Sequence, residues 1–334
     1  MKAFQIESFG LDGLVLRDIP EPELGYGQVL VEVKAASLNY RDLLMVKGYY
    51  DKNMPLPLTP LSDGAGIVAK VGPGVSRLQV GDRVAGAFFQ SWIEGPYTRD
   101  KSRQALGGPR QGALAEYYVL DEAAAVPLPP SLSFAEGATL ACAGVTAWNA
   151  LFTVQPILPG DSVLVQGTGG VSMFALQFAK AAGARVVVTS SSDEKIERAK
   201  SLGAFAGINY KATPEWGAVA RRLTDGGVDR VIEVGGAGTL KQSLDAVRFG
   251  GSVEMIGVLD GVVAEIPTTT ILHKAIQIRG IYVGSVEMFT AMNRAIEVNQ
   301  IKPVIGQTYE FAQSRDALSL LESASHFGKI VITL

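Results

Sequence analysis

The sequence has very few of the side chains that disulfide and metal chemistry need. Its 334 residues include one cysteine, Cys142, and two histidines, His273 and His326. A single cysteine excludes an internal disulfide and any site built from several cysteines, and it fits a reducing cytoplasm. The net charge is −3, from 30 basic and 33 acidic residues, so charge does not indicate a nucleic-acid partner.

Long apolar runs are also scarce. The first residues, M-K-A-F-Q-I-E-S-F, lack the apolar core of a signal peptide. One stretch, 137–160, carries no charge over 24 residues, but it contains two prolines and many small residues. We interpret it as a buried helix followed by a turn, not as a membrane span. With 47% hydrophobic and 19% charged residues, the composition is that of a globular protein and not of a disordered one. We expect no membrane partner.

Two patterns divide the chain. The first ~120 residues contain short β-type runs separated by Gly or Pro, among them V-L-V-E-V-K-A and G-A-L-A-E-Y-Y-V-L. Residues 90–112 show no periodicity and indicate a long loop. Ser133 and Glu136 have the spacing of a capping box and predict a helix start. From about residue 160 strands and helices alternate, which predicts an α/β fold with a doubly wound parallel sheet beside a β-rich domain.

A glycine-rich loop lies at the first strand-to-helix turn of the alternating half. The strand V-L-V-Q is followed by Gly167, Thr168, Gly169, Gly170 and Val171, and then by a helix. Glycines there allow a tight turn and a close approach of the backbone to a pyrophosphate, which the helix N-terminus attracts. Ser172 replaces the third glycine of the usual pattern. No G-K-[ST] follows, so a Walker loop is excluded, and we predict dinucleotide binding.

The next strand indicates which dinucleotide. NAD sites usually have an acidic residue at the end of this strand, whereas here it ends in the three serines Ser190, Ser191 and Ser192, with Lys195 and Arg198 on the following helix. These side chains favour NADP over NAD, because none repels a 2′-phosphate. Capping of the helix by the serines is the alternative reading, and the two are compatible.

These features together carry a family resemblance. The runs A-A-S-L-N-Y-R-D, P-L-S-D-G-A-G, G-D-R-V and C-A-G-V-T-A-W and the glycine loop are similar, along the whole chain, to the medium-chain dehydrogenase/reductase superfamily. Within it, the chain resembles the zinc-lacking quinone oxidoreductase-like and alcohol dehydrogenase-like members. The resemblance implies a GroES-like catalytic domain, 1–130 with 284–334, a Rossmann domain, 131–283, and a homodimer.

The resemblance also bears on zinc. Zinc-dependent relatives hold the catalytic ion with Cys, His and Cys, and the matching positions here are Asn39, Ser62 and Cys142. Asn and Ser are poor zinc ligands, and a catalytic zinc needs about three protein ligands. The loop 90–112, which matches the structural-zinc lobe of relatives, has no cysteine. We therefore expect no zinc.

The remaining site residues are implied by the family. Asn39 matches the asparagine near the nicotinamide, and Tyr50 matches a tyrosine of the substrate cleft, although packing alone would also account for a tyrosine there. Beyond the glycine loop, Ser190 and Ser191, the expected cofactor contacts are Thr146, Lys195, Tyr210, Gly257, Val258, Tyr282, Val283 and Lys329. Lys329 matches a basic residue that relatives place toward the cofactor phosphates.

Without zinc to polarise an alcohol, hydride transfer to a conjugated acceptor is the easier reaction, because its charge spreads onto an oxygen that hydrogen-bond donors can support. The sequence thus predicts an NADPH-dependent reductase of quinones or α,β-unsaturated carbonyls. A zinc-independent alcohol dehydrogenase or aldehyde reductase, and a low-turnover NADPH-binding protein, are the alternatives.

Overall fold

The computed structural model describes all 334 residues, and their contacts divide the chain into two units. Unit 1 comprises Met1–Val145 and Val283–Leu334, and unit 2 comprises Thr146–Tyr282. The first division falls later than the predicted boundary after residue 130. Helix α2 (Phe134–Ala138) belongs to unit 1 because it packs against the strands that begin at Gln28 and Asp63.

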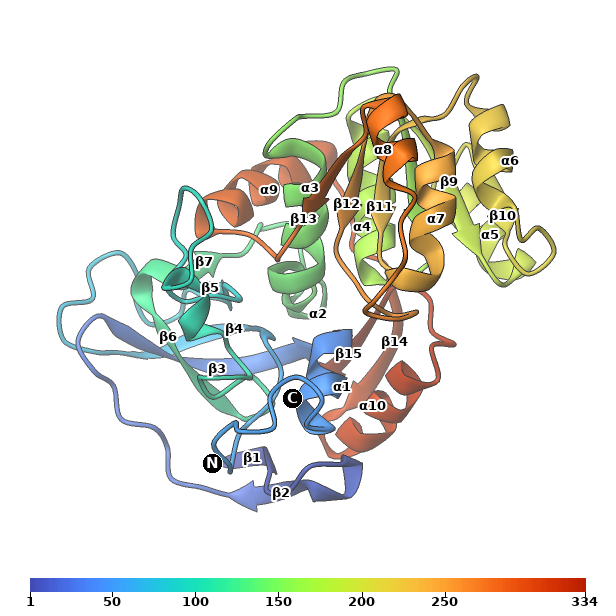
Figure 1. The fold of residues 1–334 in the computed structure, drawn as a ribbon. Helices are drawn as coiled ribbons and strands as arrows, with labels where there is room; N and C mark the ends of the chain where they lie inside the picture. The colour runs from blue at the N-terminus through green and yellow to red at the C-terminus, as the bar shows by residue number, and fades with distance from the viewer. The chain divides into compact units, whose positions relative to one another are not determined.

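Unit 1 is built on a seven-stranded, mostly antiparallel sheet. Its order is β14-β15-β3-β4-β5-β7, and β6 pairs with β3. The last strand, β15, pairs with β3, so both ends of the chain contribute to one sheet (Figure 1). The elements of unit 1 are β1 (Lys2–Ile6), β2 (Leu14–Asp18), β3 (Gln28–Ser37), α1 (Tyr40–Val46), β4 (Asp63–Val71), β5 (Arg83–Gly86), β6 (Tyr117–Asp121), β7 (Ala125–Pro127), α2, the π-helical turn η4 (Leu140–Gly144), α9 (Val286–Asn299), β14 (Ile305–Glu310), α10 (Ser314–Glu322) and β15 (Lys329–Thr333).

Unit 2 has a six-stranded, wholly parallel sheet in the order β10-β9-β8-β11-β12-β13. This is the 3-2-1-4-5-6 order of a Rossmann sheet, so the predicted fold class is confirmed. Helices alternate with the strands along the chain (Figure 1). The elements are α3 (Val145–Phe152), β8 (Ser162–Gln166), α4 (Gly170–Ala181), β9 (Arg185–Ser190), α5 (Asp193–Ser201), β10 (Ala206–Asn209), α6 (Trp216–Leu223), β11 (Val228–Glu233), α7 (Ala237–Ala246), β12 (Val247–Met255), α8 (Thr268–Lys274) and β13 (Gln277–Gly280).

Each unit has its own hydrophobic core. In unit 1, side chains such as Val31, Leu43 and Ile330 pack between the sheet and its helices. In unit 2, Leu164, Val231 and Leu244 do the same. The central strands β8 and β9 are buried on both faces, which is why they read as nearly continuous apolar runs in the sequence.

The uncharged stretch 137–160 forms the end of α2, the turn η4, helix α3 and the loop that follows. The capping box at its start is present, because the Glu136 N–H donates to Ser133 Oγ at 3.2 Å and the Ser133 N–H donates to the Glu136 carboxylate at 2.8 Å. No helix of the structure has both the length and the apolar character needed to cross a membrane.

Candidate active site

Strand register brings the polar residues of unit 1 together. Ser37, the last residue of β3, lies opposite Asp63 on β4 and opposite Val331 on β15. Lys329 begins β15, two residues before Val331, and Asn39 follows the end of β3 and caps α1. Three strand ends therefore place Asp63, Lys329 and Asn39 at one edge of the sheet.

The Lys329 ammonium is the centre of this cluster. The side chain is 3% exposed, and Nζ donates to the Leu38 carbonyl at 2.6 Å, to Asn39 Oδ1 at 2.6 Å and to Asp63 Oδ2 at 3.3 Å. Three acceptors match the three N–H bonds of an ammonium group. Asp63 is fully buried and also accepts from Ser37 Oγ at 2.7 Å, so its charge is balanced by Lys329 and hydrogen-bonded twice.

Asn39 is buried at 9% exposure and uses both ends of its backbone in the start of α1. Its N–H donates to Asp42 Oδ2 at 2.8 Å, and its carbonyl accepts from the Asp42 N–H at 2.9 Å. In the side chain, Oδ1 accepts a hydrogen bond from Lys329 Nζ, while Nδ2 has no hydrogen-bond partner. A buried donor without a partner is costly in a folded protein and is common at functional sites.

Asp42 and Arg41 extend the cluster toward Tyr50. Burial raises the pKa of the Asp42 carboxyl to about 6, opposed mainly by the nearby Arg41 guanidinium. The guanidinium carbon of Arg41 lies 5.5 Å from the centre of the Tyr50 ring and 4.9 Å from that of Phe88, within cation–π range. Arg41 Nη1 also donates to the Leu106 carbonyl at 2.6 Å. The predicted catalytic residues Asn39 and Tyr50 therefore each contact one of these two charged side chains, Asn39 through Asp42 and Tyr50 through Arg41.

The donors at the zinc-ligand positions do not suit zinc. Ser62 is fully buried, with Oγ 3.5 Å from Asp63 Oδ1, and burial raises the pKa of the Cys142 thiol well above its ordinary value. Zinc needs a thiolate or imidazole set of about three ligands, but the structure has no group of three His, Cys, Asp or Glu side chains placed to hold a metal. The Asn39 oxygen that would face a cation already accepts from the Lys329 ammonium.

The loop 88–112, whose structure the sequence did not predict, forms part of the unit 1 core. Phe88, Phe89 and Trp92 are at most 3% exposed. Their rings, with that of Tyr97, contact one another in edge-on and tilted arrangements. Gly112 approaches the chain so closely that a Cβ there would lie 2.3 Å from the Leu61 carbonyl oxygen. This packing supports the turn that leads into Ser62 and Asp63.

In unit 2 the glycine loop joins β8 to α4, as predicted. Gly167 has a φ of +68°, a conformation that favours glycine. The first backbone N–H groups of any α-helix have no intrahelical acceptor. The N-cap of α4 is Gly169, which has no side chain to accept from them. Ser172, in place of the third glycine, donates from Oγ to the Gln166 carbonyl at 2.6 Å and so holds the helix against the strand. The loop fits the pyrophosphate of a dinucleotide.

Helix α5, which follows the serine-rich end of β9, carries the two cations Lys195 and Arg198. The Tyr210 N–H donates to the Ser190 carbonyl at 3.0 Å, and Ser192 Oγ accepts from the Lys195 N–H at 3.3 Å. The alternative reading of the serines is thus confirmed for Ser192, which caps α5. Burial lowers the pKa of the Lys195 ammonium, and the positive charge of Arg198 lowers it further. Two cations near hydroxyl groups suit a phosphate.

The other predicted cofactor residues lie in α3, in the glycine loop and in the segments that follow β12 and β13. Thr146 is buried in α3, and Thr168 is buried in the glycine loop. Gly257 passes so close to the Val234 carbonyl that a Cβ would lie 2.3 Å from its oxygen. Val258 is 45% exposed, and Tyr282 and Val283 flank the division between the units. No contact to a cofactor tests these residues, and they stay predictions.

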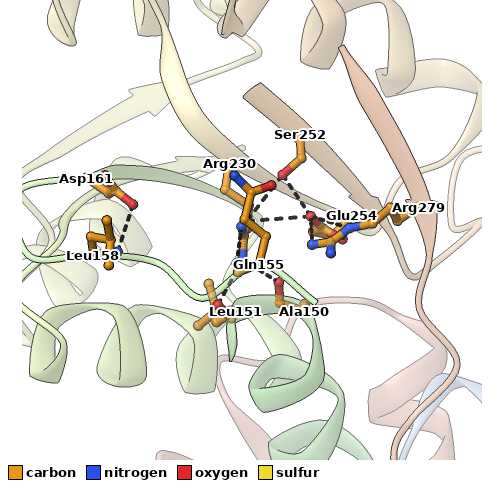
Figure 2. A network of polar contacts seen from close by, with 9 residues as sticks. All are labelled: Ala150, Leu151, Gln155, Leu158, Asp161, Arg230, Ser252, Glu254 and Arg279. Atoms are coloured by element: carbon orange, nitrogen blue, oxygen red, sulfur yellow. Dashed lines mark hydrogen bonds and ion pairs between the residues drawn. The ribbon is translucent and has the colours of Figure 1, made fainter. Parts of the chain in front are cut away.

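Sequence reasoning missed two buried polar networks of unit 2. Gln166 Nε2 donates to Glu233 Oε2 at 2.6 Å and ties β8 to β11. Figure 2 shows the second network, in which Arg230 donates to the Ala150 and Leu151 carbonyls at 2.9 and 2.8 Å and lies 3.5 Å from Glu254 Oε1. A charged residue inside an apolar strand run was the available signal, because such a residue is buried only with partners.

Comparison with protein families agrees with this architecture. Residues 25–130 match the family model of the alcohol dehydrogenase GroES-like domain, and residues 170–297 match that of the zinc-binding dehydrogenases. The first match lies within unit 1 and carries Asn39, Tyr50 and Asp63. The second begins at the start of α4.

Curated relatives cover almost the whole chain. A zinc-type alcohol dehydrogenase-like protein of Schizosaccharomyces pombe is 47% identical over 98% of this chain and 97% of its own length. The quinone oxidoreductase of Rattus norvegicus is 31% identical over 100% of this chain and 98% of its own. The chain belongs to the medium-chain dehydrogenase/reductase superfamily and is an oxidoreductase of that superfamily.

Two solved structures are similar over the full chain. An NAD-dependent alcohol dehydrogenase aligns with a TM-score of 0.92 and 34% identity, covering 100% of both chains. A mycobacterial protein solved with NADPH aligns with a TM-score of 0.84 and 26% identity, again over 100% of both chains. The GroES-like and Rossmann parts of the fold are therefore confirmed.

Proposed function

We propose that this protein is a zinc-independent, NADPH-dependent reductase of quinones or α,β-unsaturated carbonyls. The observation that carries the proposal is the buried Nδ2 of Asn39, a donor without a partner at the position where zinc-dependent relatives have a zinc ligand. A donor fixed in a site of low dielectric stabilises negative charge as it develops on an acceptor oxygen. NADPH, when bound, supplies a hydride, which with one proton from solvent reduces the acceptor by two electrons and leaves NADP⁺.

The residues of unit 1 have separate tasks in this proposal. Asn39 Nδ2 donates to the oxygen of the acceptor. Tyr50, which is 42% exposed and lies against Arg41, contributes a ring face and a hydroxyl for an aromatic acceptor. No metal is assigned, because the donors at positions 39, 62 and 142 do not form a zinc set.

The cofactor preference rests on unit 2. Lys195 and Arg198, with the hydroxyls of Ser190 and Ser191, supply the charge and hydrogen bonds that a 2′-phosphate needs, and no acidic residue stands at the end of β9. The mycobacterial relative solved with NADPH supports this choice. The similar structure of an NAD-dependent alcohol dehydrogenase favours the opposite choice, so the affinities for NADPH and NADH have to be compared.

A second candidate is a zinc-independent alcohol dehydrogenase or aldehyde reductase, which the alcohol dehydrogenase names of several relatives favour. A low-turnover NADPH-binding protein is the third. We also propose that the protein is a cytoplasmic homodimer, as the family resemblance implies.

The acceptor is tested with protein that has been treated with a chelator. NADPH oxidation is followed with a naphthoquinone, an aromatic enone and a simple aldehyde. We expect turnover of the quinone or the enone and no gain from added zinc. Turnover of the aldehyde alone supports the second candidate, and tight NADPH binding without turnover supports the third. Activity that returns only with zinc contradicts the proposal.

The cofactor preference is tested with Lys195→Ala. Loss of one charged hydrogen bond to a phosphate, about 1.5–3 kcal/mol, raises the Kd for NADPH about 10- to 150-fold and leaves the Kd for NADH unchanged. Lys200→Ala is the matched control, because Lys200 lies on the same helix and pairs with Glu197 at 2.8 Å on an exposed face. Equal losses for NADPH and NADH in Lys195→Ala contradict the assignment.

A further inference from the structure

The side chain of Asn39 is held in one of its two amide orientations. Lys329 Nζ lies 2.6 Å from the near atom of the carboxamide. An ammonium group only donates, so that atom has to be the oxygen. The nitrogen, Nδ2, then points away from Lys329, and it is buried without a hydrogen-bond partner.

Lys329, held by Asp63 and the Leu38 carbonyl, forms what we call the clamp on Asn39. Its parts come from distant segments that no local motif connects. Lys329 and Asn39 are 290 residues apart. Asp63, 0% exposed, and the Leu38 carbonyl take the other two N–H bonds of the ammonium. Ser37 Oγ donates to the same Asp63 oxygen that Lys329 contacts. With all three donors used, the ammonium has neither a rotational alternative nor an N–H to spare.

We propose that Lys329 is a positioning residue for the reduction: its ammonium orients the Asn39 carboxamide so that Nδ2 donates to the oxygen of the acceptor. The proposal rests on the proposed function, since it assigns the step that this orientation serves. A carboxamide free to rotate by half a turn presents its oxygen to the developing negative charge in one of its two states. Lys329 removes that state, and the donor is oriented before the acceptor arrives.

This role differs from the one predicted for Lys329, a contact to the cofactor phosphates. A phosphate contact changes the binding of NADPH and leaves kcat nearly unchanged. A positioning residue changes kcat and leaves the Kd for NADPH unchanged. The two roles therefore separate in one set of kinetic and binding measurements.

The kinetic test compares Asn39→Ala, Lys329→Met and the double variant with the wild-type protein. We expect each single variant to lower kcat about 10²- to 10³-fold, with an unchanged Kd for NADPH. In the Asn39→Ala background, Lys329→Met should cost less than about 3-fold more, because it acts through a side chain that is no longer there. Full additivity, or a raised Kd with an unchanged kcat, overturns the proposal.

A structural effect is controlled through Asp63, since Lys329→Met leaves that carboxylate buried without its counter-charge. The variant Lys329→Met/Asp63→Asn restores the charge balance without restoring the clamp, and it keeps the test available if Lys329→Met does not fold. We expect the thermal midpoint to recover and kcat to stay low. Recovery of kcat together with stability shows that Lys329 only neutralises Asp63, and overturns the proposal.

A measurement without turnover separates this proposal from the proposed function. In the deuterated protein, the side-chain ¹⁵N–¹H₂ pair of Asn39 is assigned by its loss in Asn39→Ala. We expect this pair to shift and broaden in both Lys329 variants, whether or not any quinone or enone is reduced. If no conjugated acceptor is reduced, the proposed function fails and this spectrum alone decides the orientation. An unchanged Asn39 pair overturns the clamp.

Discussion

Each unit of the molecule buries a charged cluster, and the two clusters use their hydrogen bonds differently. In unit 2, Arg230 donates from Nη1 to two carbonyls at the end of α3, from Nη2 to the Gln155 carbonyl, and from Nε to Ser252 Oγ (Figure 2). In unit 1, one of the three Lys329 bonds goes to a side chain, Asn39, that still has a buried donor without a partner.

The difference indicates what each cluster does. The acceptors of Arg230 are mostly backbone carbonyls, including those that a helix end leaves without partners, so the cluster joins α3 to β11. Glu254 is fully buried and receives Arg279 Nε at 2.9 Å and Ser252 Oγ at 2.8 Å, which leaves only Nη1 of Arg279, on edge strand β13, without a partner. A buried donor without a partner thus occurs in both clusters. We interpret the unit 2 cluster as structural because most of its acceptors are backbone carbonyls, whereas in the proposed function the unit 1 cluster orients a donor toward the acceptor.

The largest effect on stability is expected at Arg230. Arg230→Met removes the bonds to three carbonyls and leaves the buried Glu254 with fewer partners, so the free energy of unfolding falls by about 3–5 kcal/mol. Urea unfolding, followed by a signal from unit 2, measures the loss. NADPH turnover per folded molecule should not change.

Arg248→Ala is the control for that measurement. Arg248 pairs with Asp229 at 2.5 Å, but its side chain is 43% exposed, so its loss costs about 0–1 kcal/mol. If the two variants lose equal unfolding free energy, burial does not explain the contribution of the Arg230 cluster to stability.

The next effect is a pH dependence of the unit 1 cluster. The pKa of Asp42 rises to about 6 in the folded protein from an ordinary value of 3.8. Its carboxyl therefore binds a proton more tightly when folded. The resulting stability is fully present below about pH 4 and is lost as the pH rises through about 6. Arg41, Asp63 and Lys329 are the charges that act on it.

Asp42→Asn tests this assignment. The difference in unfolding free energy between the wild-type protein and the variant should change by about 2–3 kcal/mol between pH 4 and pH 7, in the direction of a relatively less stable wild-type protein at pH 7. Urea midpoints at several pH values measure it. A difference that is flat with pH means that Asp42 is ionised throughout that range.

The smallest effect comes from a matched pair of serines. Ser37 donates to Asp63 at 2.7 Å, and Ser252 donates to Glu254 at 2.8 Å, so each supplies one hydrogen bond to a buried carboxylate. Ser37→Ala and Ser252→Ala should each cost about 1–2 kcal/mol of stability. Only Ser37→Ala should also lower kcat, by several-fold, because Asp63 helps to hold Lys329. An equal kcat for the two variants removes the functional distinction between the clusters.

The sequence predicted much of unit 2 because its signals are local. The alternation of strand and helix, the glycine loop at 167–170 and the serine cap at Ser192 each depend on neighbours within a few residues. The parallel sheet and its Rossmann topology followed from that alternation. Unit 1 was harder, since the loop 88–112 has no periodicity and is ordered by packing of Phe89 and Trp92 and by close contacts at Leu61.

The residues of the candidate site and of the buried networks also divide into those that the sequence predicted and those that it missed. Asn39 and Tyr50 were implied by the family resemblance, in which each matches a residue of a short motif. Gln166, Glu233 and Arg230 were missed, because whether a polar residue in a strand is buried, and with which partner, depends on which strand lies beside it. Lys329 was predicted to face a phosphate, a role that no contact tests, and the structure surrounds it with Leu38, Asn39 and Asp63.

The sequence by itself determined the superfamily, the two kinds of sheet and the dinucleotide loop, because each depends on residue types at short spacing. The weak zinc-ligand set at positions 39, 62 and 142 followed from the family resemblance. The tertiary structure decided that Lys329, Asp63 and Asn39 meet. Strand order and register bring the two ends of the chain to the same sheet edge, and a contact between residues 290 positions apart has no local signature. The contact between Lys329 and Asn39 decided the orientation of the Asn39 amide. An ammonium group only donates hydrogen bonds, so the amide atom next to it has to be the oxygen.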